Sequence, residues 1–525
     1  MKILHCAFLI SFLVSSPAIV RAQDGRTVSE PTLPDPTSIC TVLTAELASV
    51  NGDLSSDDNS QFDTARIQNA LNTCSAGTAV ELQPANGNDA FQIQPITIPA
   101  GRTLLIDPGA TVYASIDPRD YDVQSGSCGI VASSSAGCKP LITLNHSNDS
   151  AIMGGGAINA RGGDTLIGLD VSWWDLSRQA QQLGQNQYNP RLIQVSNSNN
   201  LTFYQVSVIN APLFHFAISG TNGLTVWGIN INTPYGSRNT DGIDPGNATN
   251  VTVTESSISD GDDNVALGAG GAPASQVTVS NNHFGGGHGM SIGSYTQYGV
   301  NNVVVDNLNI SGVPGDHNDT GLRIKSDRSR GGLVQYISYS NVCMQNVYNP
   351  LVFDPFYSSS ATGNLIPDYR DISLHRVHVL TPGKMKLEGY DADHPLGLTL
   401  DNVIFDGTWH ASDISAQHAH LIFGPNPTNL VTPSGTDVTI DNEVTGDDPP
   451  YDCGAVFPGL GPVVTVGQGG YSSVQDAVNA LPASGGTVNI NPGVYTEVVH
   501  IDKPNVRLHG NTGSASDVVI TYDNS

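Results

Sequence analysis

Five segments of one form decide the fold of this chain. They read NNLTFYQVSVIN at 199–210, NGLTVWGININ at 222–232, TNVTVTESSIS at 249–259, SQVTVSNNHF at 275–284 and NNVVVDNLNIS at 301–311. Their first apolar residues fall at positions 201, 224, 251, 277 and 303, so the form returns every 23 to 27 residues. Short alternating strands at such a period, separated by Asn and Gly rather than by helices, indicate a stacked repeat. The sequence therefore predicts an all-β solenoid.

The same form continues on both sides of these segments. Further copies lie at 333–342, 371–379, 398–405 and 437–440. Earlier strands are expected at 78–82, 91–98, 103–106 and 111–114, between turns marked by Gly and Pro. One helix is expected in the first 450 residues, with Ile67, Ala70 and Leu71 on its apolar face and Asp63 as its cap. This helix would close the N-terminal end of the solenoid and cover an exposed sheet edge.

Composition and the N-terminus indicate an exported protein without a nucleic-acid partner. The 525 residues include 48 acidic and 21 basic side chains, a formal charge of −27, whereas phosphate binding needs a basic surface. Residues 1–22 have a basic start at Lys2, an apolar stretch and a small-residue end at Ala22, which is the pattern of a secretory signal peptide. No later apolar run reaches the roughly 20 residues that span a bilayer. We expect a secreted chain, extracellular or periplasmic, with no membrane contact after signal removal.

The cysteines support an oxidising destination. Cys6 would leave with the signal peptide, and an even number of six remains, which favours disulfides. Cys128 and Cys138 bracket a Gly/Ser-rich segment and are expected to staple it. The pairing of the other four stays open: Cys40, Cys74, Cys343 and Cys453. The sequence has no CxxC pair and no His-rich tract, so neither a metal site nor a cofactor is predicted.

Composition also divides the chain into parts. Residues 23–445 are expected to form the solenoid domain, with a Pro/Ser/Thr-rich leader at 23–37 that should be mobile. Residues 446–462 carry Pro, Gly and acids, which is typical of a linker.

The last 63 residues, 463–525, predict the start of a second β-solenoid. A helix is expected at 474–481, with strands at 487–490, 498–501 and 506–508. Because about three coils are needed for independent stability, this segment should be unfinished or docked on the first domain.

Charged residues are scarce, at 13% of the chain, yet they gather between residues 239 and 325. This stretch reads NTDGIDPG, SDGDDNVALG, GGGHGMSIGS and GLRIKS in turn. Six ionisable residues follow four successive repeats: Asp241, Asp262, Asp263, His288, Arg323 and Lys325. Stacked coils repeat like positions about 4.8 Å apart, so these side chains should line one face within roughly 15 Å.

Such a group has the parts that glycoside hydrolysis requires. One carboxyl must donate a proton to the leaving oxygen, and another must activate water or attack directly. The crowding of Asp262 beside Asp263 would raise the pKa of one of them and keep it protonated. Arg323 and Lys325 would bind an acidic sugar. A single Asp could instead serve a solenoid turn through local backbone bonds, and the common phase of all six residues favours a site.

Two other features are open on the residues alone. His215 lies in PLFHFAIS, inside a repeat. The pair Trp173–Trp174 could stack on sugars or could pack in the core.

At the clustered motifs the sequence resembles the polygalacturonases of glycoside hydrolase family 28. NTDGID, GDDNVALG, GGGHGMSIGS and RIKS occur in that family's order and approximate spacing, and GGGAINARGG at 154–163 is similar to a further family segment. The resemblance covers about residues 40–445. It implies a right-handed parallel β-helix that hydrolyses, with inversion, the α-1,4 links between galacturonic acid units of pectin. We expect a monomer that works without a cofactor on this polysaccharide.

The resemblance also implies a role for each motif residue. Asp262 would be the general acid, while Asp241 and Asp263 would activate the water. His288 would support the site. The other family positions would bind substrate: Asn239, Arg323, Lys325 and Tyr357, the last in NPLVFDPFY.

The chain departs from the family at one turn. Family members often carry Cys directly after the aspartate pair and four residues before the histidine, and these positions are Asn264 and Phe284 here. Both halves of that staple are absent together. Other packing must then hold the turn after Asp263, which is where we expect local mobility.

The tail, from VVTVGQGGYSSVQDAVNALP to VVITYDNS, resembles the beginning of a pectin methylesterase. The Gln, two Asp and Arg that catalyse in that family would lie further along. No esterase activity is therefore expected from this chain.

Three functions remain open at this point. The first is a pectin-cleaving hydrolase that acts either internally or from the chain end. The second is a pectate lyase-type enzyme, which would need Ca²⁺ held by acids and an Arg as base. The third is a non-catalytic β-solenoid for carbohydrate binding or adhesion, in which Asp262→Asn would change little.

Overall fold

The structure is a computed structural model. It describes residues 24–50, 52–54, 61–134, 137–454, 456, 463–467, 471–481, 486–503, 506–510 and 518–522. The expected signal peptide, with Cys6, lies outside the described residues. None of the described helices is long and apolar enough to cross a membrane.

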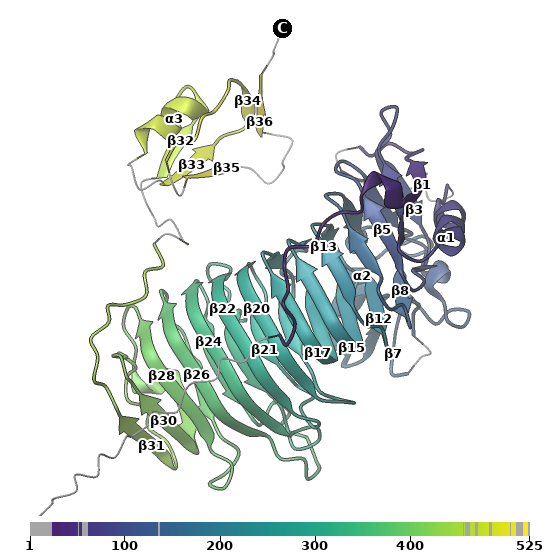
Figure 1. The fold of residues 1–525 in the computed structure, drawn as a ribbon. Coiled ribbons are helices and arrows are strands. Elements are labelled where there is room, and N and C mark those ends of the chain that lie inside the picture. The colour runs from purple at the N-terminus through teal and green to yellow at the C-terminus, as the bar shows by residue number, and fades with distance from the viewer. Residues whose placement is uncertain are drawn as a thin grey trace, which may run out of the picture.

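Most of the described chain winds into a parallel β-helix whose successive coils stack strand upon strand (Figure 1). The strands pair in three columns. Column 1 contains β4 (Ile96–Thr97), β8 (Ile142–Asn145), β12 (Ile193–Ser196), the first parts of β15 (Phe216–Trp227) and β17 (Ile243–Thr254), β19 (Val265–Leu267), β21 (Met290–Ile292), β23 (Thr320–Lys325), β25 (Asn349–Asp354), β27 (Met385–Glu388) and β29 (Ile414–Gln417).

Columns 2 and 3 form the other two sides. Column 2 contains β1 (Ile39–Thr44), β2 (Thr78–Gln83), β5 (Arg102–Ile106), β9 (Ala151–Met153), β13 (Leu201–Tyr204), the later parts of β15 and β17, the first parts of β20 (Ala274–Phe284), β22 (Val300–Ser311), β24 (Leu333–Gln345), β26 (Asp368–Val379) and β28 (Leu396–Phe405), then β30 (Ala419–Phe423) and β31 (Val438–Asn442). Column 3 contains β3 (Ala90–Ile93), β6 (Thr111–Ala114), β10 (Ala157–Asn159), β14 (Ser207–Ile209), β16 (Asn230–Asn232), β18 (Ser257–Ser259) and the ends of β20, β22, β24, β26 and β28.

The apolar residues that begin each repeat point inward and stack in register. Leu201 pairs with Leu224, then Val251, Val277 and Val303 follow on successive coils, and all five are buried. The residue just before each of them has a positive φ, between 55° and 86°. Asn and Gly adopt this left-handed conformation most readily, which explains why the repeat carries them there. The predicted parallel β-helix is confirmed.

Two elements near the N-terminus differ from expectation. The strand expected at 91–98 is two strands, because Pro95 lies at a corner where the chain passes from column 3 to column 1. The expected helix is present as α1 (Thr64–Thr73) and buries the predicted face. Asp63 does not cap it with its side chain. That carboxylate instead accepts hydrogen bonds from the Gln92 N–H and from Arg66, and so ties the helix to β3.

A second helix, α2 (Trp173–Leu183), was not predicted. It begins with a capping box between Ser172 and Asp175 and ends at Gly184 in a left-handed conformation. Trp173 is fully buried, and Trp174 Nε1 donates to the Ala211 carbonyl. The Trp pair therefore packs the helix onto the coils. The described residues also include three short 3₁₀ helices: η1 (Pro36–Ser38), η3 (Pro118–Tyr121) and η4 (Ala411–Asp413).

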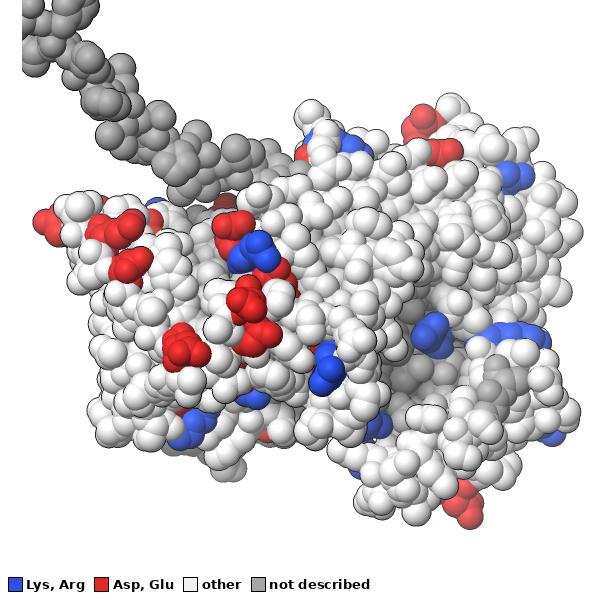
Figure 2. Space-filling model, turned by 90° about the horizontal axis from the view of Figure 1, so that it is seen from below, with Lys and Arg blue, Asp and Glu red and all other residues white. Residues whose placement is uncertain are grey.

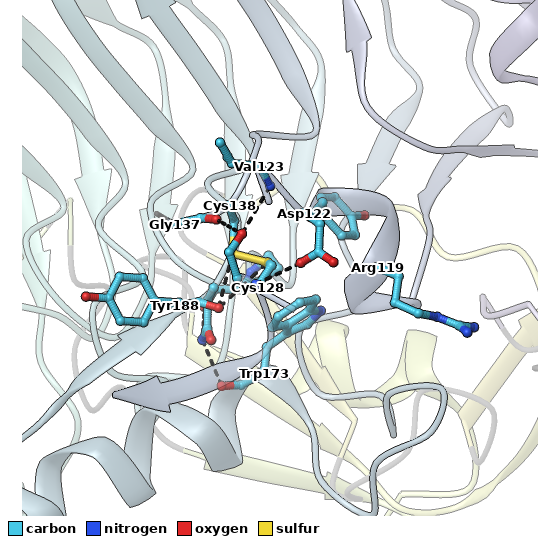
Figure 3. Close-up of a disulfide and its surroundings, with 12 residues drawn as sticks. Arg119, Asp122, Val123, Cys128, Gly137, Cys138, Trp173 and Tyr188 are labelled. Carbon is cyan, nitrogen blue, oxygen red and sulfur yellow. Dashed lines mark hydrogen bonds between the residues drawn. A yellow bond between two sulfur atoms is a disulfide. The ribbon is translucent and has the colours of Figure 1, made fainter. Parts of the chain in front are cut away.

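The expected disulfide Cys128–Cys138 is present, and Cys40–Cys74 and Cys343–Cys453 complete the set among the described residues. Figure 3 shows Cys128–Cys138 between Asp122 and Tyr188: the Cys128 N–H donates to the Asp122 carboxylate, and the Gly129 N–H donates to the Tyr188 carbonyl. The loop contains β7 (Ile130–Ala132), which pairs antiparallel with β11 (Asn186–Tyr188). This pairing fastens the loop beside the site described below.

The leader predicted to be mobile is instead held as a strap along column 2. Figure 1 shows this purple segment running beside the coils. The Asp24 carboxylate accepts from the Thr252 hydroxyl and pairs with Arg26. Arg26 donates to the Leu224 carbonyl, and Tyr204 donates to Glu30. The prediction of mobility failed because a Pro/Ser/Thr-rich composition does not show that Thr hydroxyls of column 2 will bond to the leader.

The expected linker begins with residues that are fixed to the β-helix. Cys453 is bonded to Cys343 of β24, and the Tyr451 carbonyl accepts from His378 of β26. The Tyr451 ring also lies against the Arg376 guanidinium, at 4.7 Å. The domain boundaries proposed at 445 and 462 remain predictions.

The C-terminal segment has its own small core. It contains α3 (Val474–Ala480), as expected, and parallel strands β32 (Val463–Val466), β33 (Gly486–Ile490) and β35 (Val506–Gly510), with β34 (Gly493–Thr496) paired to β36 (Val518–Thr521). The strand expected at 498–501 is absent there, and β34 lies before it. Its membership of a second solenoid, and the resemblance to a methylesterase, remain predictions.

Candidate active site

The clustered residues stand at equivalent places on adjacent coils of column 1. Ile243, Val265 and Met290 are paired in register in β17, β19 and β21. Asp241, Asp263 and His288 each lie two residues before one of these positions, so they follow one another at about 4.8 Å per coil. The next coil brings Arg323 opposite Ser291. The stack predicted from the repeat is therefore formed.

Asp263 is the electrostatic centre of the stack. Its two carboxylate oxygens accept from Arg323, from Lys325 Nζ at 2.8 Å and from the Ser291 hydroxyl at 2.9 Å. Burial alone would raise the pKa of Asp263, but the positive charges of Arg323, Lys325 and His288 outweigh it and hold that pKa below its usual range. Asp263 is thus a fixed negative charge.

Asp262 points to the other side of the turn. Its Oδ2 accepts from Asn239 Nδ2 at 3.0 Å, and its Oδ1 lies 2.9 Å from His288 Nδ1. Gln187 of β11 in turn donates to Asn239 Oδ1 at 2.8 Å. Gln187 was not predicted from the sequence, since it is 52 residues from Asn239 and reaches it only through the stapled loop.

Asp241 and Asp244 have buried carboxyls whose pKa is raised. One oxygen of each is buried without a hydrogen-bond partner among the described residues. Burial, then the neighbouring negative charges, raise the pKa of both well above the usual value. The sequence interpretation placed the raised pKa within the Asp262–Asp263 pair. Asp263 is not the member of the pair with a raised pKa, because Arg323 and Lys325 reach it across two coils.

The turn after Asp263 is fastened by the residue that replaces the family cysteine. Asn264 is fully buried, and its amide donates to Asp260 Oδ2 at 3.2 Å and to the Gly286 carbonyl at 3.1 Å. Its Oδ1 accepts from the Gly289 N–H at 2.9 Å. Phe284 is buried in the core. A polar clamp therefore spans the residues on both sides of His288, where we had expected mobility.

A second clamp holds the His288 loop from the opposite side. Asp319, just before β23, accepts from the Gly287 N–H at 3.3 Å and from the Val313 N–H. Burial raises its pKa to about 6, against the lowering effect of these two N–H groups. This role depends on a contact with a residue 32 positions away, and no motif of the sequence indicates it.

His215 lies beneath the site and not in it. It is fully buried; Nδ1 donates to the Asp241 carbonyl at 3.0 Å, and Nε2 accepts from the Thr233 hydroxyl at 2.8 Å. Burial lowers its pKa to about 4. The ring is thus a neutral support for the backbone of Asp241.

Tyr357 extends the site along the column. Its ring is 48% exposed and lies 5.2 Å from Lys325 Nζ, while its N–H donates to the Ser326 carbonyl. It is the one predicted site residue with a largely exposed side chain, and a sugar ring could lie on it.

Two hollows flank the aspartates. One, of about 360 Å³, is lined by Asp241, Asp244, Asp263 and Lys325. The other, of about 390 Å³, is lined by Asp262, His288 and Asp319. Figure 2 shows how sparse charged side chains are on one face of the molecule, with Lys and Arg bordering a hollow.

The site fits a divalent cation poorly. Asp262, Asp263 and His288 offer ligand atoms within 4.8 Å of one another. However, both oxygens of Asp263 are already bound by Arg323 and Lys325, whose charge opposes a cation. Calcium prefers six to eight oxygen ligands, and this set offers few free ones. The geometry thus disfavours the lyase interpretation.

A parallel β-helix that stacks carboxyls of lowered and raised pKa with two cations in one groove has the parts of a polysaccharide-cleaving enzyme. Comparison with known proteins makes this specific. The model of glycosyl hydrolases family 28 matches residues 89–421. This chain belongs to that family.

Its relatives are similar over most of their length. A polygalacturonase of Ralstonia nicotianae is 39% identical over 512 residues, covering 86% of this chain and 96% of the relative. An endo-polygalacturonase of Pectobacterium carotovorum subsp. carotovorum is 41% identical over 400 residues, covering 75% and 94%. The solved polygalacturonase from Erwinia carotovora ssp. carotovora has a TM-score of 0.67 at 40% identity, covering 75% of this chain and 100% of that one.

Proposed function

We propose that this chain hydrolyses the α-1,4-galacturonosidic bonds of polygalacturonate in pectin. Family membership and the names of its relatives support this substrate and reaction. The observation that carries the proposal is the arrangement around Asp263, where a buried ionised carboxylate holds two cations beside further carboxyls. The cations suit an anionic sugar, and the carboxyls suit acid and base catalysis.

Cationic side chains hold the substrate, and the groove partly removes it from water. Arg323 and Lys325 bind the carboxylate of a galacturonate unit, with Tyr357 against its ring and Asn239 beside the acid. The Arg323 guanidinium already uses one nitrogen for Ser291 and one for Asp263, which fixes its plane. A planar guanidinium in a fixed orientation is suited to a sugar carboxylate.

Cleavage is a single displacement at the anomeric carbon. Asp262 donates its proton to the leaving glycosidic oxygen as the C–O bond breaks. A water molecule attacks from the opposite side and gives its proton to the carboxylate pair Asp241 and Asp263. Asp241 is the stronger base of the two once ionised, because its pKa is raised, and Asp263 supplies the constant negative charge. The product forms with inversion.

His288 supports the acid. Its Nδ1 contact fixes the Asp262 carboxyl, and the two clamps at Asn264 and Asp319 fix the His288 loop. The ring is partly exposed in the second hollow, beside Asp262.

Incubation with polygalacturonate tests the proposal. We expect new reducing ends without ultraviolet-absorbing unsaturated products, and no loss of rate with a chelator. Unsaturated products or chelator sensitivity would favour the lyase. Binding without any reducing ends would favour the non-catalytic solenoid. The lengths of the first products decide between internal and terminal cleavage, and the relatives named endo-polygalacturonase support internal cleavage.

We further propose that the chain is secreted and monomeric. The three disulfides support an oxidising compartment, because such bonds are rare in the cytosol. Recovery of activity from the culture medium, and a size-exclusion mass near that of one chain, are the expected results.

A further inference from the structure

Arg191 stands in line with the catalytic stack but on its N-terminal side. Ile193 of β12 pairs with Phe216 of β15, which pairs with Ile243 of β17. Arg191 lies two residues before Ile193, just as Asp241 lies two residues before Ile243. Arg191 is therefore two coils, or about 10 Å, from Asp241 along the column. Arg323 and Lys325 lie on the other side of the aspartates.

The Arg191 guanidinium is oriented but not neutralised. It lies 5.4 Å from the centre of the Phe214 ring, and one nitrogen donates to Gln194 Oε1 at 3.0 Å. Among the described residues no carboxylate lies within ion-pair distance of it, whereas Arg323 and Lys325 both pair with Asp263. Arg191 is exposed and lines the hollow of about 360 Å³ together with Gln194 and Asp241. Its charge thus faces the groove.

Part of the hollow beside Arg191 and along the aspartates is lined by small side chains, with Ala217 and Ser219 on the coil between Arg191 and Asp241. Ala217, Ser219, Gly246, Ala266 and Gly268 line this hollow. A Cβ placed on Gly268 would meet only the Tyr295 carbonyl oxygen, at 3.9 Å, so the groove is open there. Space over small side chains, next to a cation that has no ion-pair partner among the described residues, suits a sugar unit that carries a carboxylate.

We propose that Arg191, oriented by Phe214 and Gln194, binds the carboxylate of a galacturonate unit. This unit lies on the side of the cleaved bond that faces the N-terminal coils of the β-helix. This inference rests on the proposed function and identifies a second anion-binding position for the same substrate. It also explains how a chain of formal charge −27 holds a polyanion beside four aspartates. Cations on both sides of the catalytic carboxyls offset the repulsion where the substrate must lie.

Replacement of Arg191 by Gln tests the inference. A charge-assisted hydrogen bond to a carboxylate is strong enough that its loss should raise KM for long oligogalacturonates roughly 10-fold or more. The kcat should change less than about two-fold, because Arg191 does not touch the reacting atoms. For oligomers too short to reach from Arg323 to Arg191, the replacement of Arg191 should change neither KM nor kcat. Arg370→Gln, an exposed arginine paired with Asp368 on column 2, is the matched control and should leave both constants unchanged.

Three further results separate charge recognition from a structural role. On the methyl-esterified oligomer the difference between Arg191→Gln and the wild type should vanish, and Arg191→Lys should recover part of the affinity for the acid. An Arg191→Gln variant with unchanged KM on long acidic oligomers would overturn the inference. Equal loss on acidic, esterified and short substrates would overturn it as well, since that pattern describes damaged packing against Phe214.

Binding in the Asp262→Asn background keeps the two proposals distinguishable. Calorimetry with a long oligogalacturonate should show at least a 10-fold weaker affinity when Arg191→Gln is added. A wild type that binds the oligomer and releases no reducing ends would contradict the proposed hydrolysis, while this affinity difference would still decide the role of Arg191.

Discussion

Columns 1 and 2 are built on the same backbone repeat, but their outward side chains differ in the hydrogen bonds that they make. On column 2 the outward row is Thr and Ser: Thr254 and Ser280 share a hydrogen bond of 3.1 Å, and Thr252 donates to Asp24 of the strap. On column 1, Asp241 and Asp244 each keep a buried oxygen without a partner among the described residues.

The difference shows which part of the fold serves stability and which part serves a ligand. Polar groups buried without partners cost free energy, so a fold retains them where a bound molecule will use them. The outward Thr and Ser residues of column 2 bond to their neighbours and to the strap. Column 1 retains unsatisfied carboxyls and the unpaired Arg191, and it is there that the substrate is proposed to bind.

The largest expected effect follows replacement of Asp262, and the same replacement at Asp306 on column 2 is its control. Asp262→Asn removes the proton donor without changing shape, and the rate of polygalacturonate hydrolysis should fall roughly 10³-fold or more. Asp306→Asn is the matched change on column 2, where the carboxylate only accepts from Asn341, and it should leave the rate unchanged. Thermal unfolding should show both variants folded. Comparable rates for the two variants would remove the distinction between the columns.

The next effect concerns two buried asparagines. Asn264→Ala removes the clamp on the His288 loop and leaves the Gly289 N–H buried and unpaired, which costs about 1–3 kcal/mol of stability. Because the loop then shifts, kcat should fall on the order of 10-fold. Asn282→Ala breaks a similar pair of bonds, to the Val253 carbonyl and from the Ser256 N–H, far from the acid. It should lower stability by a similar amount with an unchanged kcat; equal kcat values in the two variants would refute the positioning role of Asn264.

A smaller effect depends on pH. The pKa of His215 is lowered by burial to about 4, from an ordinary value of about 6.5. As pH falls through this window the unfolded chain binds the proton first, so stability present above about pH 6.5 is progressively lost towards pH 4. Between pH 7 and pH 5 this loss is about 2 kcal/mol. Urea unfolding of the wild type and of His215→Gln should show the difference as a steeper pH dependence in the wild type, and parallel profiles would count against it.

The smallest effect concerns the strap. Asp24→Ala removes the contact with Thr252 and the ion pair with Arg26, and should lower stability by about 1 kcal/mol while kcat stays constant. Limited proteolysis should then cut the leader faster than in the wild type. Asp35→Ala, in the same leader but with its carboxylate bonded to the neighbouring Thr37 and Ser38, should not change the cleavage rate. If it does, the strap is held by something other than its bonds to column 2.

The sequence predicts the solenoid well because its signal is local and repeated. Asn200, Asn250 and Asn302 each mark a left-handed position before an inward apolar residue, and the same pattern fixes the register that stacks Asp241, Asp263 and His288. The helix α2 was missed although its capping box, Ser172 to Asp175, is readable in the sequence.

What could not be predicted depends on contacts between distant coils. The pKa of Asp263 is lowered by Arg323 and Lys325, 60 and 62 residues away, so crowding alone could not show which member of the Asp262–Asp263 pair has the lowered pKa. Gln187 and the Asn264 clamp likewise appear only when coils are stacked. Composition could not show that the leader would bind column 2.

The central claim is that Asp262 and a water held at Asp241 and Asp263 act from opposite sides of an α-galacturonosidic bond. Proton NMR of the first reducing sugars released from a galacturonate oligomer tests this most directly, because it reads their configuration before mutarotation. Because the linkage is α and the displacement inverts, the β-anomer should appear first. An α-anomer first, which means retention, or an unsaturated product in place of either, would contradict it.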